Sequence, residues 1–287
     1  EPAGWAGVVG IFRDYGARHR RNRARLKFLV SDWGAERFRE VLETEYLGRR
    51  LLDGPAPVED PERRRDHLGV HPQVDGRFWV GVAPIGGRVS GTTLTAVADL
   101  AARHGSGRVR LTAHQKLLVL DVPEAEVATL VVELDALGLP ANASEWRRGV
   151  LACTGIEFCK LALVETKARA RSAVEELERR IPDLDAPVTI HVNGCPNSCA
   201  RFQVADIGLK GLVMTGASGE TVEGFQVHLG GALGGNARLA RKTRALRVEA
   251  DDLVDYVERV VTRFRTDQAP GESFAEWAHR ADEEALR

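Results

Sequence analysis

The chain has 287 residues and a mass of 31.4 kDa, enough for two compact domains of about 150 residues each. Apolar residues make up 44% of it and charged residues 28%, a balance that excludes wholesale disorder, a collagen-like repeat and a coiled-coil rod. The 40 Lys and Arg residues nearly cancel the 41 Asp and Glu residues, so no overall positive field indicates nucleic-acid binding.

The N-terminal apolar run, residues 4–12, is far shorter than the roughly 18 residues that a membrane span needs. It also lacks the basic start and the cleavage pattern of a secretory signal. We therefore expect a cytoplasmic protein without a membrane partner. Because the sequence begins with Glu1 and not with Met, we expect a processed or truncated piece.

Residues 1–53 predict a helix, a basic turn and a second helix, with Asp32 as the candidate N-cap of the second helix. The apolar stripe of that helix comprises Trp33, Phe38, Val41, Leu42 and Tyr46. So short a helical piece buries little core by itself, and we expect it to be the tail of a preceding half. Residues 54–68 combine prolines with dense charge, which is typical of a linker.

Residues 69–143 show the pattern of a small α+β domain. The expected elements are a strand at 78–84, a helix over 94–101, strands at 109–112 and 117–122, and a helix over 127–137. This order of strand, helix, strand, strand and helix predicts a ferredoxin-like domain. We expect its last strand near residues 145–150.

Residues 144–287 predict a larger α/β region. The expected elements are a helix over 164–180, strands at 188–193 and 225–229, and a final helix over 253–264. The first of these two strands leads directly into the second of two cysteine pairs.

All four cysteines of the chain lie in one 47-residue stretch with the spacing C-x5-C-x35-C-x3-C. They are Cys153, Cys159, Cys195 and Cys199. One helical turn would place the last two sulfurs on the same face. Small residues beside the cysteines let the backbone approach a bulky inorganic core, and free N–H groups there stabilise its negative charge.

Four interpretations of this pattern stay open on the residues alone. Buried structural thiols are common, and disulfides are disfavoured by a cytosolic setting. Structural zinc sites usually have more closely spaced cysteine pairs. An iron–sulfur cluster bound by four thiolates fits best.

Four stretches of this sequence resemble the siroheme-dependent nitrite and sulfite reductases. They read RVRLTAHQKLLVLDV, ACTGIEFCKLALVETKARA, IHVNGCPNSCARFQVADIGLKG and VEGFQVHLGGALG. The resemblance implies an α+β fold in which a ferredoxin-like domain precedes a siroheme- and [4Fe–4S]-binding α/β domain. It further implies that the chain is the cluster-bearing C-terminal half of an oxidoreductase. Such enzymes reduce sulfite to sulfide, or nitrite to ammonia, by six electrons.

The resemblance also implies site residues. The four cysteines would ligate the [4Fe–4S] cluster, and Cys199 would bridge to the siroheme iron. Arg110 and Gln115 are expected at the siroheme rim, where Arg pairs with carboxylates and Gln donates hydrogen bonds. Asn193 and Asn197 flank Cys195 and are expected to shape the cofactor loop. No catalytic residue is assigned, because the family's substrate-binding cations belong to the missing half.

Several weaker candidates accompany these residues. Gly230, Gly231, Gly234 and Gly235 could cradle an anion, and Arg201 and Lys210 could offset the charge of the cofactors. His114, His191 and His228 could relay protons. The cations at 18–27 could dock an acidic electron donor.

The expected partners are a small anionic substrate, an electron-donor protein such as ferredoxin, and a separate N-terminal half. The sequence contains no flavin or nicotinamide fingerprint, which is why the electrons are expected from another protein. Two alternatives are a monooxygenase similar to precorrin-3B synthase and a non-catalytic cluster-binding or zinc-binding domain.

Overall fold

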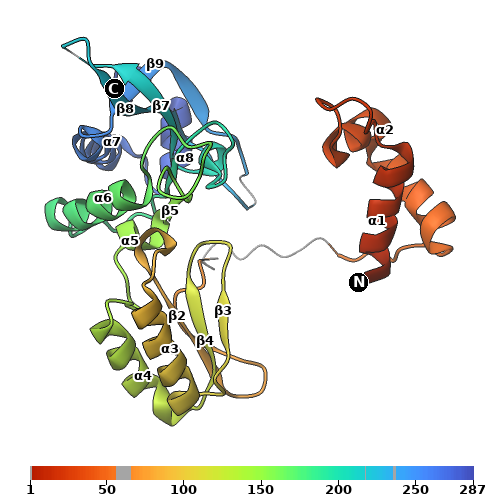
Figure 1. The fold of residues 1–287 in the computed structure, drawn as a ribbon, viewed down its shortest axis with the longest axis horizontal. Helices are drawn as coiled ribbons and strands as arrows, with labels where there is room; N and C mark the ends of the chain where they lie inside the picture. Colours follow the sequence, from red (N-terminus) through yellow and green to blue (C-terminus); the bar gives the residue numbers. More distant parts are fainter. Residues whose placement is uncertain (1, 56–65, 217, 235–236) are drawn as a thin grey trace. The chain divides into compact units, whose positions relative to one another are not determined.

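The computed structural model describes residues 2–55, 66–216, 218–234 and 237–287. The chain forms two compact units, Glu1–Val58 and Glu59–Arg287 (Figure 1). The predicted linker lies mostly outside the described residues. The domain boundaries at 53, 68 and 143 therefore stay predictions.

The first unit is helical, as the sequence predicts. It consists of α1 (Pro2–Tyr15), α2 (Leu26–Val41) and a π-helical turn, η1 (Leu42–Leu47). Its small core contains Ile11, Leu29 and Leu42. The N-cap prediction for Asp32 is wrong, because α2 already begins at Leu26, which brings Leu29 into this core. Asp32 instead forms an ion pair with Arg23, whose Nη2 lies 2.8 Å from Asp32 Oδ1.

The second unit begins with a four-stranded antiparallel sheet of order β1-β2-β4-β3. Its strands are β1 (Gly69–Pro72), β2 (Phe78–Val82), β3 (Val109–Leu111) and β4 (Leu117–Val122). Helices α3 (Gly91–His104) and α4 (Glu124–Ala136) pack together on one face of this sheet (Figure 1). A 3-10 turn, η2 (Ile85–Gly87), follows β2. The ferredoxin-like prediction is confirmed, although β1 was not expected.

The predicted last strand of this domain is wrong. Glu145–Gly149 forms a short helix, α5, capped by the Ser144 hydroxyl, which accepts from Arg147 N at 3.2 Å. The helical turn buries the Trp146 ring and lets its Nε1 donate to Ile181 O at 3.0 Å. The strand that follows, β5 (Val150–Ala152), belongs to a different sheet.

That second sheet has five strands in the order β5-β6-β7-β8-β9. The remaining strands are β6 (Ile190–Asn193), β7 (Ile207–Thr215), β8 (Thr221–Leu229) and β9 (Arg241–Glu249). β5, β6 and β7 are parallel, whereas β7, β8 and β9 are antiparallel. The associated helices are α6 (Lys167–Arg180), α7 (Leu253–Asp267) and α8 (Phe274–Arg280), and a 3-10 turn, η3 (Phe202–Val204), precedes β7.

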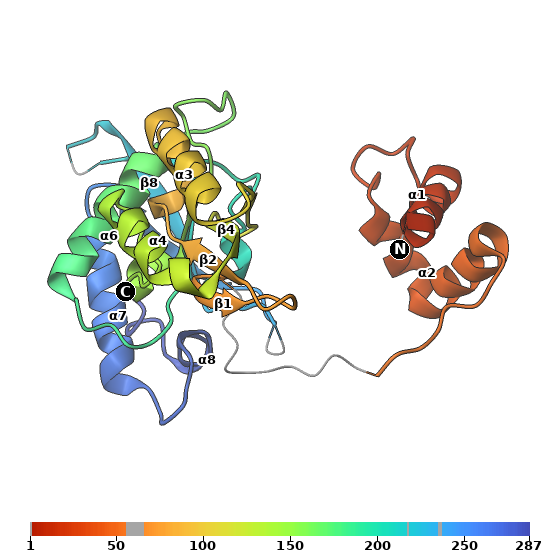
Figure 2. The ribbon, with the colours of Figure 1, turned by 90° about the horizontal axis from the view of Figure 1, so that it is seen from below.

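One face of this sheet is apolar and carries the main core. Ile190, Val192, Leu209 and Val227 pack there with α6 and α7, which lie on the same side of the strands in Figures 1 and 2. Because side chains alternate along a strand, the intervening residues point to the opposite face. In the described part of the chain, no helix has both the length and the apolar character needed to cross a bilayer.

Candidate functional site

The opposite face of the five-stranded sheet is polar, and we call it the polar face. Its residues are His191 and Asn193 on β6, Lys210 on β7, and Gln226 and His228 on β8. All of them except Lys210 are buried. Neighbouring strands place Asn193 beside Lys210 and Lys210 beside Gln226. Both cysteine pairs follow strands of this sheet.

The first cysteine pair lies in the loop after β5. Cys153 continues the strand, because its N–H donates to Val192 O of β6 at 3.0 Å. Cys159 closes a turn in which its own N–H donates to Gly155 O at 3.0 Å. Both side chains are partly exposed. Gly155 has φ +74°, and a Cβ there would lie 2.3 Å from the Thr166 hydroxyl, so the loop requires glycine at this point.

The second cysteine pair lies in the loop after β6. Cys195 is buried and Cys199 is exposed. The predicted helical turn between them is absent, because Ser198 and Arg201 adopt left-handed backbone angles of φ 63° and 56°. The two sulfurs therefore do not share a helical face.

The two loops meet at Gly194. Its N–H donates to Cys153 Sγ at 3.2 Å, and its carbonyl accepts from Leu163 N at 2.7 Å. A Cβ on Gly194 would lie 3.0 Å from Ala162 Cβ. This contact places both cysteine loops at the carboxyl ends of parallel strands, where α/β sheets commonly bind ligands.

Asn193 lies between the polar face and the second loop. Its Oδ1 accepts from Ala200 N at 2.7 Å, which supports the predicted loop-shaping role. Its Nδ2 is buried and has no hydrogen-bond partner within the described residues. A buried amide donor without a partner is costly, so this atom indicates a missing acceptor at the site. Asn197 is exposed, and among the residues that the structure describes it has no hydrogen bond that would shape the loop.

Gln115 and Arg110, both predicted at the siroheme rim, differ in their hydrogen bonding. Gln115 Nε2 donates to Ala152 O at 2.7 Å, and its Oε1 accepts from Ala152 N at 3.1 Å. Gln115 therefore fixes the residue that precedes Cys153. Arg110 is exposed on β3, with no hydrogen bond or ion pair to any residue that the structure describes, so its guanidinium is available to an anion.

The histidines near the polar face are neutral at pH 7. Burial lowers the pKa of His191 to about 4 and that of His228 to about 4, and the neighbouring Lys210 adds to the second shift. Burial and the charge of Arg201 also lower the pKa of His114. Arg201 donates to Ala113 O at 3.2 Å, which joins the second cysteine loop to the turn between β3 and β4.

The first two glycines after β8 do not contribute to the anion cradle that the sequence suggests. Gly230 N donates to Asp206 O at 2.8 Å, and Gly231 N donates to Ala205 O at 2.8 Å. These N–H groups are therefore used within the fold. Gly235 lies outside the described residues.

Sequence reasoning missed a second group of contacts around the first cysteine loop. Lys167 Nζ, at the start of α6, donates to Ala152 O at 2.8 Å and to Gly86 O. Arg88 forms a two-pronged ion pair with Glu157, with its Nη2 2.6 Å from Oε1. Lys167 lies in the quoted ETKARA stretch, but its spacing gave no hint of this contact.

The residues present fit an iron–sulfur cluster. All four cysteines are free thiols, which argues against the disulfide alternative. Within the described ranges, no three His, Cys, Asp or Glu side chains are grouped as one metal ion would require. A cubane cluster makes a different demand, because each of its thiolates binds a separate iron. The Gly194 N–H and the unpartnered Asn193 amide supply donors of the kind that surround cluster sulfurs.

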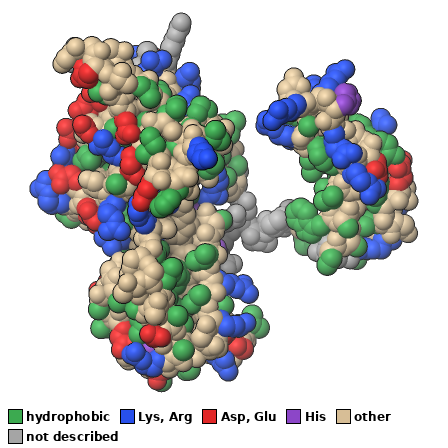
Figure 3. Space-filling view, viewed as in Figure 1, with side chains coloured by type: hydrophobic (Ala, Val, Ile, Leu, Met, Phe, Trp, Pro, Cys, Tyr) green, Lys and Arg blue, Asp and Glu red, His purple; other side chains and the backbone are tan. Residues whose placement is uncertain are grey.

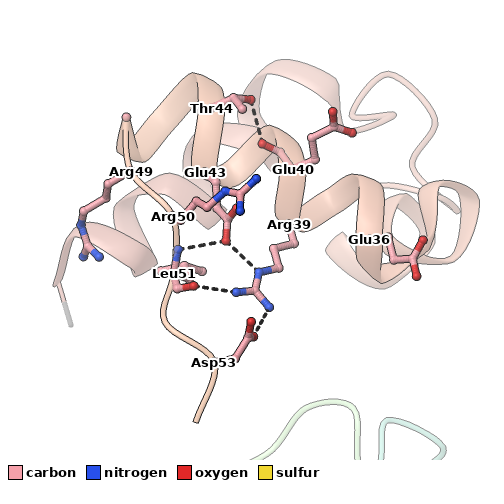
Figure 4. A pocket seen from close by; sticks show the side chains of 10 residues that line it. Glu36, Arg39, Glu40, Glu43, Thr44, Arg49, Arg50, Leu51 and Asp53 are labelled. Carbon is pink, nitrogen blue, oxygen red and sulfur yellow. Dashed lines mark hydrogen bonds and ion pairs between the residues drawn. The ribbon is translucent and has the colours of Figure 1, made fainter.

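A depression in the first unit carries no comparable chemistry (Figure 4). Arg39 Nε pairs with Glu43 at 2.7 Å, and its Nη2 donates to Leu51 O at 2.7 Å. Leu51 N in turn donates to Glu43 Oε1 at 2.9 Å. These bonds fasten residues 48–53 to the end of α2, and the lining contains no cysteine or histidine.

The basic segment predicted as a docking candidate, residues 18–27, follows α1 and runs into the first turn of α2. Figure 3 shows Lys and Arg side chains crowded at one end of the first unit, whereas on the larger unit they alternate with Asp and Glu. The exposed cations of the basic segment are Arg18, Arg20, Arg21, Arg25 and Lys27. A charge run of this kind is usually a solvated surface.

Comparison with known proteins places these features in a family. A family model described as "Nitrite and sulphite reductase 4Fe-4S domain" matches residues 3–51 and 145–287. A second, described as "Nitrite/Sulfite reductase ferredoxin-like half domain", matches residues 71–137. Together they cover most of the chain.

Curated relatives agree with this result. "Sulfite reductase [ferredoxin]" of Mycobacterium tuberculosis is 56% identical over 290 residues, which span all of this chain and 52% of the relative. "Assimilatory ferredoxin-dependent nitrite reductase" of Haloferax mediterranei is 35% identical and covers 98% of this chain and 50% of its own length. The chain thus spans about half the length of the curated relatives that it matches.

Solved structures show the same relationship. The Mycobacterium tuberculosis NirA protein superposes with a TM-score of 0.94 at 56% identity, over all of this chain and 53% of that protein. A dissimilatory sulfite reductase, DsrI, superposes with a TM-score of 0.55 at 15% identity, a likeness of fold alone.

Proposed function

The chain belongs to the nitrite and sulfite reductase family, and from this membership we propose that it is the cluster-bearing half of a reductase of sulfite or nitrite. The proposed reaction is the six-electron reduction of sulfite to sulfide or of nitrite to ammonia. It needs a siroheme coupled to a [4Fe–4S] cluster. The comparisons favour this function over the precorrin-3B synthase-like monooxygenase.

One observation carries the proposal. The loops that carry the two cysteine pairs leave the carboxyl ends of β5 and β6, and the hydrogen bond from Gly194 N to Cys153 Sγ joins them. Asn193 is the last residue of β6 and directly precedes Gly194. Its Nδ2 has no hydrogen-bond partner among the described residues. Four thiolates with main-chain and amide donors beside them are the surroundings that an anionic cluster requires.

Each predicted residue then has a proposed role. Cys153, Cys159, Cys195 and Cys199 ligate the cluster. Cys199 is also the proposed bridge to the siroheme iron, and its exposure supports this, because a bridging sulfur must reach a second cofactor beyond the protein surface. Arg110, which is exposed and unpaired among the described residues, is proposed to contact a siroheme carboxylate.

The bound cofactors supply single-electron transfer and a metal site for the substrate. The chain's residues control the surroundings of that chemistry. Gln115 fixes the end of β5 through Ala152, and the Asn193 carbonyl oxygen fixes the turn around Ala200. The neutral rings of His191 and His228 add no positive charge to the polar face at pH 7. Lys210, also on this face, contributes the cation there.

The proposed partners follow from the same family membership. Ferredoxin is the proposed electron donor, and the substrate is a small anion. The remaining part of the active site is proposed to come from a preceding half of the protein, since the relatives are about twice as long. The cytoplasmic location stays a prediction.

The proposal is tested by purifying the chain without oxygen and measuring its visible spectrum, iron content and siroheme content. We expect about four cluster irons per chain after reconstitution. Siroheme bands in addition would mean that this half alone binds the coupled centre. If one zinc and no iron bound to the chain instead, the non-catalytic alternative would replace the proposal.

The bridging role of Cys199 has its own test. Cys199→Ser should lose or distort the coupled centre, whereas Ser198→Ala alters only the neighbouring turn. Normal cofactor content and normal magnetic coupling in Cys199→Ser would contradict the assignment.

A further inference from the structure

Lys167 is a partly buried cation beside the first cysteine loop. It is the first residue of α6, directly after the fully buried Thr166. Its ammonium donates to two carbonyl oxygens, Ala152 O at 2.8 Å and Gly86 O. Within the described residues, no carboxylate lies at ion-pair distance from it. Partial burial of an unpaired charge is costly, so the fold retains this charge against a free-energy penalty.

Lys167 lies close to the first cysteine along the main chain, because Ala152 O, which accepts from its ammonium at 2.8 Å, belongs to the residue before Cys153. Burial lowers the pKa of Lys167. Arg88, the other cation acting on Lys167, is already paired with Glu157. Glu165, two residues before Lys167, also acts electrostatically on it but forms no ion pair with it.

The same contacts fix the position of the charge. Ala152 O accepts from both Lys167 Nζ and Gln115 Nε2, and Ala152 is the residue before Cys153. Gly86 belongs to η2, at the end of the ferredoxin-like sheet. The ammonium is therefore held by two separate segments, and a fixed charge acts more strongly than one on a mobile surface side chain.

We propose that Lys167 is a positioning residue that sets the reduction potential of the cluster bound through Cys153. The inference rests on the proposed function. A fixed positive charge stabilises the reduced cluster, which carries one more negative charge than the oxidised cluster. Lys167 therefore makes the cluster easier to reduce, in keeping with the effect of neighbouring charge and hydrogen bonds on cluster potentials.

The test compares four variants of the full chain after anaerobic cluster reconstitution. Lys167→Met removes the charge and the hydrogen bonds, Lys167→Gln keeps a donor without the charge, and Lys167→Arg keeps the charge. Arg171→Met is the matched control, because it removes one positive charge from an exposed position on the same helix. The readout is the midpoint potential, followed by the electron paramagnetic resonance signal of the reduced cluster.

We expect Lys167→Met and Lys167→Gln to shift the potential to more negative values. The expected size is about tenfold in the reduction equilibrium, or about 59 mV for a one-electron couple. Lys167→Arg and Arg171→Met should stay close to the unaltered chain. If the two neutral variants instead bound a full cluster at an unchanged potential, the role of Lys167 would be refuted and the proposed function would stand.

The remaining outcomes are also decisive. Loss of the cluster in both neutral variants, with retention in Lys167→Arg, would show that the charge is needed for cluster binding and would overturn its proposed role in setting the potential. Loss in all three Lys167 variants would assign the residue to packing and overturn the inference. Absence of iron from the unaltered chain would overturn the proposed function itself. This outcome is measured without any variant.

Discussion

The main-chain N–H of Gly194 lies 3.2 Å from the sulfur of Cys153, and this bond joins residues 41 positions apart in the sequence. It exists because β5 and β6 are parallel and in register, with Ala152 opposite Val192. The loops that leave these strands must then turn beside each other. The donor is a main-chain group, and a Cβ on Gly194 would crowd it, because that atom would lie 3.0 Å from Ala162 Cβ and 3.2 Å from Val164 O.

Gly155→Ala should weaken the first cysteine loop. The residue has φ +74°, and its new Cβ would lie 2.3 Å from the Thr166 hydroxyl. The left-handed backbone costs about 1–2 kcal/mol, and overpacking adds about 1–3 kcal/mol. We expect a loss of about 2–5 kcal/mol in the free energy of unfolding, measured with urea, and a lower iron content.

Gly219→Ala is the matched control for this change. Gly219 has φ +88°, but no atom lies within 4 Å of the position its Cβ would occupy. It should therefore show only the backbone cost of about 1–2 kcal/mol. Equal losses in the two variants would mean that the contact with Thr166 is unimportant.

The fold was predictable where a local pattern coincided with tertiary packing. The apolar stripe of α7 faces the core through Val257, Val260 and Phe264, and its spacing alone predicts a helix. The pattern failed at residues 145–149, where a single buried tryptophan determines the local structure. A short segment offers too few residues for a period to be recognised.

The candidate site likewise has a part that the sequence predicts and a part that only the fold reveals. The cysteine spacing predicts the candidate cluster ligands, because the two members of each pair lie close together in the sequence. The contacts of Lys167 and Gln115 with Ala152 depend on how three separate segments meet, and no spacing in the sequence encodes that. The free Nδ2 of Asn193 likewise becomes visible only once its other partners are known.

Gln115→Ala should destabilise the chain, whereas Arg110→Ala should not. Gln115 makes two hydrogen bonds to the Ala152 main chain, and its loss leaves the Ala152 N–H without its partner, whereas Ala152 O keeps the bond from Lys167. We expect a cost of about 1–3 kcal/mol in urea unfolding. Exposed Arg110 should change stability by less than about 0.5 kcal/mol but lower the siroheme content, because its proposed partner is a carboxylate of that cofactor. Reversal of the two stability effects would contradict the assignment.

His104 should make stability dependent on pH. Its Nδ1 lies 2.7 Å from Glu126 Oε2 and its Nε2 lies 2.7 Å from Glu133 Oε2. Because carboxylates only accept, both ring nitrogens donate and the ring is an imidazolium. The hydrogen bond to Glu126 is the main cause of its raised pKa.

The sign of the effect follows from that shift. The folded state keeps the proton at pH values where the unfolded chain, with a pKa of about 6.5, has released it. The stabilisation is therefore complete below about pH 6.5 and is lost as the pH rises through the raised pKa. Urea unfolding across this range should show a smaller decline for Glu126→Gln and for His104→Gln than for the unaltered chain. Parallel curves for all three proteins would refute the imidazolium assignment.

Asn193→Asp should separate the two roles of Asn193. The variant keeps an oxygen to accept the Ala200 N–H, so the turn around Cys199 should survive. It replaces the unpartnered Nδ2 donor with a second oxygen that carries negative charge. If a bound anionic cluster or cofactor accepts from Nδ2, the carboxylate repels it, so iron or siroheme content should fall several-fold. Circular dichroism checks that the fold is retained, and a folded variant with full cofactor content would show that Nδ2 faces no acceptor.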